Sequence, residues 1–201
     1  MYIARILYPV RVLGPGERIG IWFNGCRHRC PGCSNPELWE QQDRYKVSSD
    51  VLVSLINQIC QTHKVDGFTL TGGDPFMQPE ALAQLLPVLS KISADVLVYT
   101  GYDYNTVAQM YPEEIRQIGV LIDGKYIESR NIGLPLRGSD NQNIIVLKEQ
   151  LQDKYQHYLD SAQNEIQNFT TLDGVISVGI HKPGYDVQVD NLLKQKGLEN
   201  I

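Results

Sequence analysis

A predicted strand runs directly into three cysteines in the segment Ile19-Gly20-Ile21-Trp22-Phe23-Asn24-Gly25-Cys26-Arg27-His28-Arg29-Cys30-Pro31-Gly32-Cys33-Ser34-Asn35. The strand is apolar and follows the turn Gly14-Pro15-Gly16, so the cysteine loop begins where a strand ends. Cubane iron–sulfur clusters usually take four thiolates, and structural zinc sites take four protein ligands. Three clustered cysteines therefore leave one coordination position open, which indicates chemistry rather than a purely structural metal.

The spacing of the cysteines has to be weighed against other kinds of metal site. A zinc knuckle would need His28 as its fourth ligand, but His28 stands only two residues from Cys26 and from Cys30, unlike the usual zinc-ligand spacings. A plain ferredoxin would need a fourth cysteine nearby, whereas Cys60 lies far downstream in a predicted amphipathic helix and is expected to be a small core residue. The pattern favours a cluster that binds a small molecule at its open position.

Length and charge set the frame for this site. The 201 residues suffice for about one domain with a substantial core. The chain has 18 basic and 23 acidic side chains and no long run of Lys and Arg, which argues against nucleic acid as the primary ligand. The first residues lack the pattern of a secretory signal, and no apolar run of about 20 residues is present to span a membrane. We therefore expect a cytoplasmic protein without a membrane partner, in which clustered cysteines indicate metal binding or catalysis rather than disulfides.

Short apolar strands alternate with amphipathic helices through most of the chain. Strands are predicted at residues 68–71, 96–100 and 120–122. A helix is predicted before each strand: one capped by Ser48 or Ser49, one that contains Leu82, Leu85, Leu86 and Leu89, and a weaker one over about residues 107–118. This alternation predicts an α/β fold with a mostly parallel sheet, because parallel neighbours need crossover connections. Ligands bind at the carboxyl ends of such strands. The stops Gly72-Gly73-Asp74, Thr100-Gly101 and Asp123-Gly124 are therefore expected to meet the cysteine loop on one rim.

The pattern changes after about Leu147, which predicts a core of residues 1–147 and a C-terminal extension of residues 148–201 packed on it. One amphipathic helix is predicted by the spacing of Leu151, Tyr155, Tyr158, Ala162 and Ile166. A hairpin turn is predicted at Leu172-Asp173-Gly174-Val175, because Asp-Gly suits a two-residue turn. Residues 175–180 and 185–189 are predicted to pair as a small antiparallel piece, followed by a short helix over residues 191–196.

The Cys-x3-Cys-x2-Cys spacing resembles that of the radical S-adenosylmethionine enzymes. Within them the chain resembles the family of anaerobic ribonucleoside-triphosphate reductase activating proteins, in stretches that span about residues 8–146 in the right order. These stretches are Gly14-Pro15-Gly16-Glu17-Arg18, Cys30-Pro31-Gly32-Cys33-Ser34-Asn35, Thr71-Gly72-Gly73-Asp74-Pro75, Tyr99-Thr100-Gly101-Tyr102, Val120-Leu121-Ile122-Asp123-Gly124-Lys125-Tyr126 and Leu136-Arg137-Gly138-Ser139-Asp140-Asn141-Gln142. The resemblance implies the partial (β/α) barrel of the radical S-adenosylmethionine type.

The resemblance also implies what the site residues do. Cys26, Cys30 and Cys33 would hold a [4Fe-4S] cluster whose fourth iron binds the methionine end of S-adenosyl-L-methionine. The resemblance places Gly72 and Gly73 beside the methionine amino group, and the backbone of Gly32 and Ser34, on either side of Cys33, beside the adenine. The further candidates for cofactor binding are Asp74, Thr100 and Asp123, although Asp74 can equally cap the following helix and Asp123 can bond to its own turn. No side chain is expected to act as an acid or base, because the four histidines form no visible array with carboxylates or serines.

A partner and an electron donor follow from the same resemblance. The partner would be a glycyl radical enzyme, an anaerobic ribonucleotide reductase, and the low-potential donor a flavodoxin or ferredoxin. The sequence departs from the family pattern at Gly32, where many radical enzymes carry an aromatic residue, and in its long extension, which contains no cysteine. Two other functions stay open: a radical S-adenosylmethionine enzyme acting on another peptide or a small molecule, and a non-enzymatic iron–sulfur or zinc-binding module.

Overall fold

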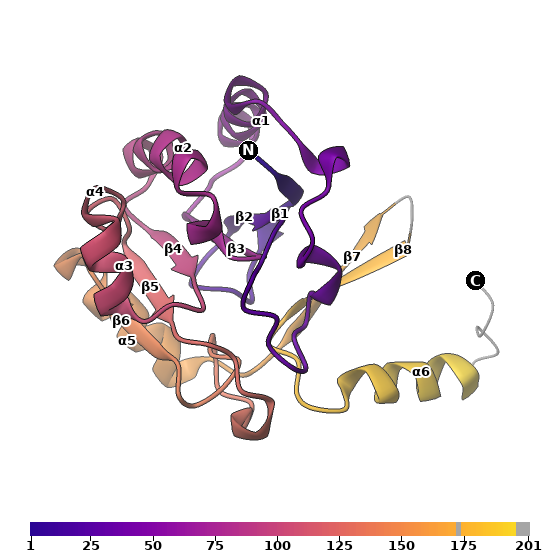
Figure 1. The fold of residues 1–201 in the computed structure, drawn as a ribbon. Coiled ribbons are helices and arrows are strands. Elements are labelled where there is room, and N and C mark those ends of the chain that lie inside the picture. The colour runs from indigo at the N-terminus through magenta and orange to yellow at the C-terminus, as the bar shows by residue number, and fades with distance from the viewer. Residues whose placement is uncertain (172–173, 196–201) are drawn as a thin grey trace.

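The computed structural model describes residues 1–171 and 174–195. Its main element is a six-stranded sheet in the order β1-β2-β3-β4-β5-β6 (Figure 1). The strands are β1 (Ile3–Val10), β2 (Arg18–Phe23), β3 (Gly67–Gly72), β4 (Val96–Tyr99), β5 (Val120–Asp123) and β6 (Asn143–Val146). The four strands from β2 to β5 are parallel neighbours, whereas β1 and β6 pair antiparallel at the two edges. The expected α/β fold with a mostly parallel sheet is confirmed.

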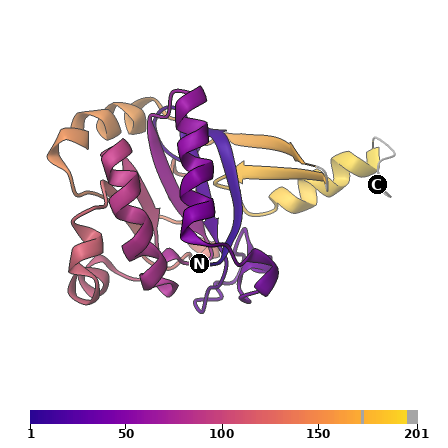
Figure 2. The same ribbon diagram turned by 90° about the horizontal axis from the view of Figure 1, so that it is seen from above.

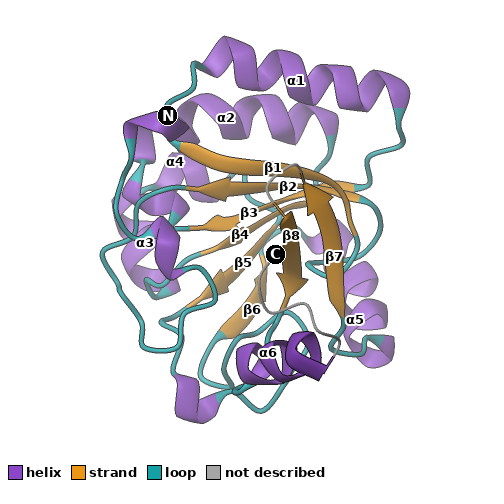
Figure 3. Ribbon diagram, turned by 90° about the vertical axis from the view of Figure 1, so that its right-hand side faces the viewer, coloured by secondary structure: helices purple, strands orange, loops and turns teal. Residues whose placement is uncertain are grey.

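The two edge strands were not predicted, and they define the form of the sheet. β1 and β6 end the hydrogen-bonded order, so the pairing describes an open sheet, which fans out in Figure 3. The strand pairing therefore does not establish the barrel that the resemblance implied. Six of the eight residues of β1 are only half-buried, which is why its apolar pattern is weak in the sequence.

Four helices cover one face of the sheet: α1 (Ser49–Thr62), α2 (Pro79–Ile92), α3 (Tyr104–Met110) and α4 (Pro112–Ile115). The predicted cap of α1 is confirmed, since the Ser48 hydroxyl accepts a hydrogen bond from the Val51 backbone N–H at 3.3 Å. α1 and α2 lie side by side in Figure 2 and bury their apolar residues in the same core cluster as Phe68 and Leu70 of β3. Among the described residues, no helix is both long enough and apolar enough to cross a bilayer.

The helix expected over residues 107–118 is instead the two short helices α3 and α4. The break falls at Tyr111 and Pro112, because proline lacks a backbone N–H and disfavours helical geometry in the residue before it. Each piece still buries an apolar side chain, Val107 in α3 and Ile115 in α4. The apolar spacing therefore predicted the buried side chains correctly, but the prediction of one continuous helix was wrong.

The C-terminal extension contains α5 (Gln152–Ser161), β7 (Ile166–Thr171), β8 (Gly174–Gly179) and α6 (Tyr185–Gln195). The prediction of one helix reaching Ile166 was wrong, because α5 ends at Ser161 and Ile166 begins β7. The predicted strand over residues 185–189 was also wrong, since these residues open α6. Residues 172 and 173 of the expected hairpin turn, and Lys196 of the expected last helix, lie outside the described residues, but Thr171 and Gly174 pair on either side of the turn.

α5 and the β7–β8 hairpin of the extension pack on the face of the sheet opposite α1 and α2 (Figure 3), whereas α6 projects away from the sheet (Figure 1). Alternate residues of β2 point to opposite faces, so Ile21 joins the core under the helices and Trp22 joins a separate cluster. Val178 of β8 is 3% exposed and belongs to that second cluster, together with Val10 and Leu13. The β7–β8 hairpin therefore covers part of the sheet face that the core helices leave open.

Candidate functional site

The cysteine loop is fixed at its start by hydrogen bonds to a neighbouring loop. Asn24 is fully buried; its side-chain amide donates to the Glu40 carbonyl at 3.0 Å and its side-chain oxygen accepts from the Gln42 N–H at 2.7 Å. The next backbone N–H groups, of Gly25 and Cys26, donate to the carbonyls of Leu38 and Trp39 at 2.8 and 2.9 Å. The first cysteine therefore leaves β2 in a defined direction.

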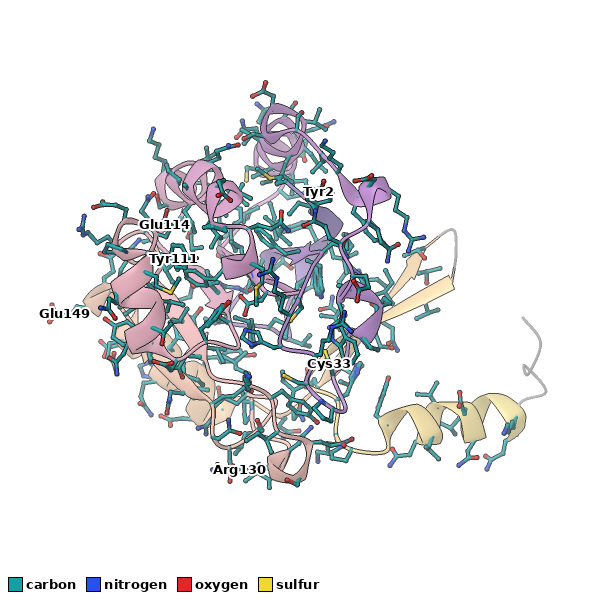
Figure 4. All side chains as sticks on the ribbon, viewed as in Figure 1. Tyr2, Cys33, Tyr111, Glu114, Arg130 and Glu149 are labelled. Carbon is teal, nitrogen blue, oxygen red and sulfur yellow. The ribbon has the colours of Figure 1, made fainter. Side chains whose placement is uncertain are left out.

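All three loop cysteines are free, half-buried thiols. Burial raises the pKa of the Cys26 thiol and of the Cys30 thiol, and the nearby charge of Cys33 raises both further. Cys33 is therefore within electrostatic range of both other thiols. In Figure 4, Cys33 lies in the half of the molecule away from α1 and α2.

The donor set of this loop fits an iron–sulfur cluster better than a single ion. Among the described residues, no three His, Cys, Asp or Glu side chains are arranged around one metal position. A four-iron cluster binds its thiolates at separate corners, so its ligands need not converge on one point. The three thiols of this loop can therefore serve as separate corner ligands of a cluster. The loop is shaped by Gly32, whose φ of +70° lies in the left-handed region.

Asp74 connects the cysteine loop to the ends of β3 and β4. Its carboxylate is 2% exposed and accepts hydrogen bonds from His28 Nε2 at 2.8 Å, from the Thr100 hydroxyl at 3.0 Å and from the Gly101 N–H at 2.9 Å. It also accepts from the Phe76 N–H at 3.0 Å, which caps the short 3-10 helix that follows. Of the two roles expected for Asp74, the capping role is present, and the carboxylate additionally joins three segments of the rim.

Gly72 and Gly73 allow the end of β3 to pass very close to the start of the cysteine loop. A Cβ atom on Gly73 would lie 2.4 Å from the Gly25 carbonyl oxygen, and one on Gly72 would lie 2.7 Å from the Phe23 carbonyl oxygen. Gly73 N–H donates to that Phe23 carbonyl at 2.7 Å. Contacts within the chain itself therefore require glycine at both positions, in addition to any approach to a ligand.

Two cavities at this rim are lined by cysteines of the loop. The first, named here the cysteine cavity, has a volume of about 140 Å³ and is lined by Cys26, His28, Cys30, Thr71, Gly72, Gly73, Asp74, Tyr99, Thr100, Gly101, Gly124, Tyr126 and Gln142. The second, named the hairpin cavity, has a volume of about 170 Å³ and is lined by Leu13, Trp22, Cys33, Ser34, Asn35, Thr71, Tyr99, Tyr126, Gly138, Gln142, Ser177, Val178, Gly179, Ile180 and His181. Both are lined by Thr71, Tyr99, Tyr126 and Gln142, so they adjoin and offer room for an elongated ligand.

The structure brings most of the predicted site residues to these cavities. Eight line the cysteine cavity or the hairpin cavity: Cys26, Cys30, Cys33, Ser34, Gly72, Gly73, Asp74 and Thr100. Gly32 lines neither; a Cβ atom there would lie 2.6 Å from the Glu128 carboxylate. Asp123 also lines neither, and its carboxylate accepts from the Tyr104 N–H at 2.8 Å and from the Asn143 side-chain amide at 2.8 Å. Asp123 therefore bonds within the protein at its strand end.

Sequence reasoning missed several residues of the site. Tyr126 and Gln142 stand within stretches that carried the family resemblance, so the signal was present, but no role was assigned to them. His28 was considered only as a metal ligand, whereas its Nε2 atom is bonded to Asp74. The residues of β8 gave no signal, because a strand some 140 residues after the cysteines reveals its position only through tertiary packing.

Comparison with known proteins gives a consistent set of relatives. Residues 12–145 match the family described as a 4Fe-4S single cluster domain. The anaerobic ribonucleoside-triphosphate reductase-activating protein of Escherichia coli K12 is 33% identical over 143 residues, which cover 67% of this chain and 92% of that relative. The proteins of the same name from Enterobacteria phage T4 and Vibrio cholerae are 31% and 33% identical over 69% and 68% of this chain, and over 90% and 93% of the relatives. QueE from Escherichia coli, a solved structure, aligns with a TM-score of 0.42 and 22% identity over 50% of this chain and 52% of its own, which is too low to carry a structural argument.

Proposed function

Because the chain belongs to the family of anaerobic ribonucleoside-triphosphate reductase-activating proteins and carries a 4Fe-4S single cluster domain, we propose that it is a radical S-adenosylmethionine enzyme that installs a glycyl radical on a partner. The partner under this proposal is an anaerobic ribonucleotide reductase, as the names of the relatives suggest. The observation that carries the proposal is the joining of a loop with three free thiols to two adjoining cavities at the carboxyl ends of β2, β3 and β4.

The residues that line the two cavities would hold both the cluster and S-adenosylmethionine. Cys26, Cys30 and Cys33 would hold the [4Fe-4S] cluster, and the backbone around Gly72 and Gly73 would bind the methionine end of S-adenosylmethionine in the cysteine cavity. When bound, these groups supply reductive cleavage of the sulfonium to methionine and a 5'-deoxyadenosyl radical, which removes a hydrogen atom from a glycine of the partner.

The protein's own contribution is to hold the residues of the site in position. Asp74 fixes His28 and Thr100 relative to each other, so the cysteine loop and the rim of β4 keep one arrangement. Ser34 and Asn35 follow Cys33 into the hairpin cavity, where the Asn35 N–H donates to Cys33 Sγ at 3.4 Å. A hydrogen bond to a ligand sulfur tunes the potential of an iron–sulfur cluster. An external low-potential donor, a flavodoxin or ferredoxin, would supply the electron.

One observation favours a second candidate function. The hairpin of the extension lines the second cavity and lies after residue 145, where the family match ends. A different wall beside the reacting end of the cofactor suits a different substrate, so a radical enzyme acting on another peptide or a small molecule is the alternative.

The test is anaerobic reconstitution followed by reduction in the presence of S-adenosylmethionine, with 5'-deoxyadenosine measured by chromatography. We expect product from the wild type and from Cys60→Ala, and none from Cys30→Ala, because Cys60 lies in α1 with its thiol outside both cavities. Absence of product from the wild type would refute the radical chemistry. With the candidate reductase added, a glycyl doublet in the electron paramagnetic resonance spectrum supports the proposed partner, and cleavage without a doublet supports the alternative.

A further inference from the structure

The hairpin cavity has a wall that comes from the C-terminal extension. Its lining includes five consecutive residues, Ser177, Val178, Gly179, Ile180 and His181, at the end of β8 and directly after it. Cys33, Ser34 and Asn35 of the cysteine loop line the same cavity. Two segments separated by more than 140 residues in the sequence therefore enclose one space beside the third cysteine.

This wall is fixed to the core at several points. At the β7 side, the Gln167 amide donates to the Pro9 carbonyl at 2.7 Å, and its oxygen accepts from the Arg11 N–H at 2.9 Å. After β8, the Asn131 amide donates to the His181 carbonyl at 2.7 Å, and the His181 ring stacks on Tyr185 with centroids 4.4 Å apart. Gln167 pairs with Val178 across the hairpin, so both sets of bonds hold the end of β8 that lines the cavity, in the manner of a structural wall rather than a free tail.

The chemistry of the lining suits an aromatic, partly polar ligand. Trp22, Tyr99 and Tyr126 bring aromatic rings, and Val178 and Ile180 bring aliphatic surface. Ser34 and Gln142 supply polar groups at the margin, and the buried Tyr99 hydroxyl has no hydrogen-bond partner among the described residues. Sites for small ligands typically combine such an apolar lining with a few polar groups that fix orientation, and nucleobases bind well against aromatic and apolar side chains.

We infer that β8 and the residues just after it form the adenosine-side wall of the cofactor site, with Ile180 in apolar contact with the nucleoside. The inference rests on the proposed function for the identity of the ligand. It adds residues from a segment that lies outside the family match, which ends at residue 145. The methionine end, in the cysteine cavity, has no contribution from the hairpin among the residues that line it.

β8 offers a matched pair of variants. Ile176 and Ile180 are both partly buried and both pack against the cluster that contains Val10 and Trp22. Ile180 lines the hairpin cavity, whereas Ile176 lines the neighbouring cavity between the hairpin, α6 and the cysteine loop. The variants Ile180→Ala and Ile176→Ala therefore remove the same side chain from the same hydrophobic cluster. Dissociation constants for 5'-deoxyadenosine and for methionine are measured separately by equilibrium dialysis on the anaerobically reconstituted full-length chain.

We expect Ile180→Ala to weaken 5'-deoxyadenosine binding about tenfold, the effect of losing several buried methyl and methylene groups, and to leave methionine binding unchanged. Ile176→Ala should bind both ligands as the wild type does, with a similar change in melting temperature. Equal nucleoside affinity in Ile180→Ala and wild type, or equal loss in both variants, would overturn the inference. Absence of S-adenosylmethionine cleavage by the wild type would refute the proposed function instead, since the nucleoside binding comparison needs no turnover.

Discussion

His28 Nε2 lies 2.8 Å from Asp74 Oδ2, and both side chains are almost completely buried. Since the carboxylate accepts this bond, Nε2 is the ring nitrogen that carries the hydrogen. The ring also packs edge-on against Tyr102, with centroids 4.7 Å apart. A residue between the first two cysteines is thus anchored to the carboxylate that connects β3 and β4, which makes His28 a positioning residue for the cysteine loop.

The first prediction concerns that anchor. His28→Ala removes the bond to Asp74 and should make the reconstituted cluster about tenfold more sensitive to a chelator, the usual effect of losing a group that orients metal ligands. His28→Gln, which keeps an N–H donor, should recover part of the loss. The rate of iron loss to the chelator, with iron and sulfide content, checks this. His63→Ala, at the end of α1, is the control, and a wild-type rate of iron loss in His28→Ala would contradict the prediction.

The second prediction concerns the close approach of β3 to the cysteine loop. Gly73→Ala would place Cβ 2.4 Å from the Gly25 carbonyl oxygen, which is backbone and cannot rotate away. We expect a loss of about 2 kcal/mol in the free energy of unfolding and a lower iron content after reconstitution, because the loop must shift to relieve the overlap.

Gly174→Ala at the hairpin provides the comparison for Gly73. Gly174 has φ +134° and nothing within 4 Å of its Cβ position, so alanine there strains the backbone without moving the cysteine loop. It should lower stability and leave iron content unchanged. Equal iron content in both variants would show that the β3 approach does not position the loop.

These relationships mark the limit of what the sequence could predict. Periodicity located β3, β4 and β5 and the helices α1 and α2, because their buried residues recur locally at a regular spacing. It failed for α6, where Tyr185-Asp186-Val187-Gln188-Val189 alternates like a strand while Tyr185, Val189 and Leu192 also follow helical spacing. Five residues cannot separate these two periods, and the choice depends on tertiary packing.

The site residues also divide into those that local sequence predicts and those that depend on tertiary packing. Glycine-rich strand ends placed most of the candidate residues on one rim, because parallel strands share a carboxyl edge. The bonds of Asp74 to three partners and the position of β8 depend on contacts between distant segments. Asp123 lies at a strand end as predicted, but its carboxylate does not line either cavity. It accepts hydrogen bonds from Tyr104 and Asn143 instead.

The third prediction concerns a buried ion pair at the opposite end of the sheet. Arg18 is fully buried, and its guanidinium donates to Asp95 Oδ1 at 2.9 Å. Burial alone would raise the pKa of Asp95, but the hydrogen bond and charge of Arg18, with Lys154 and Tyr155, outweigh it and lower the pKa. Asp95→Asn leaves the Arg18 charge buried without a counter-charge, and should lower the free energy of unfolding by about 3 kcal/mol at pH 7.

The sign of the pH dependence follows from the lowered pKa of Asp95. The stabilisation is fully present above the unfolded-state value of about 3.9 and is lost as the pH falls through the lower folded-state pKa. The difference between wild type and Asp95→Asn in urea unfolding should therefore be constant from pH 7 to about 5 and shrink below about pH 4. Glu113→Gln, which breaks the exposed pair with Arg116, should change stability by less than about 1 kcal/mol. A difference that grows on acidification would refute the assignment.

The fourth prediction separates the attachment of the extension from its proposed part in the cofactor site. The Tyr155 hydroxyl of α5 donates to Asp95 Oδ1 at 2.7 Å and is fully buried, so Tyr155→Phe should cost about 2 kcal/mol of stability. Arg18 begins β2 and Asp95 precedes β4, whereas the cysteine loop follows the end of β2, so this contact lies at the other end of the strands.

Tyr155→Phe should therefore lower the melting temperature and leave iron content and 5'-deoxyadenosine affinity at wild-type values. Combined with Asp95→Asn, it should cost less than the sum of the single changes, because both remove the same hydrogen bond. Urea unfolding of the two single variants and the double variant measures this coupling. A loss of nucleoside affinity in Tyr155→Phe would mean that α5 and the hairpin respond as one unit, and that the effect of hairpin variants on the cavity passes through the packing of the whole extension.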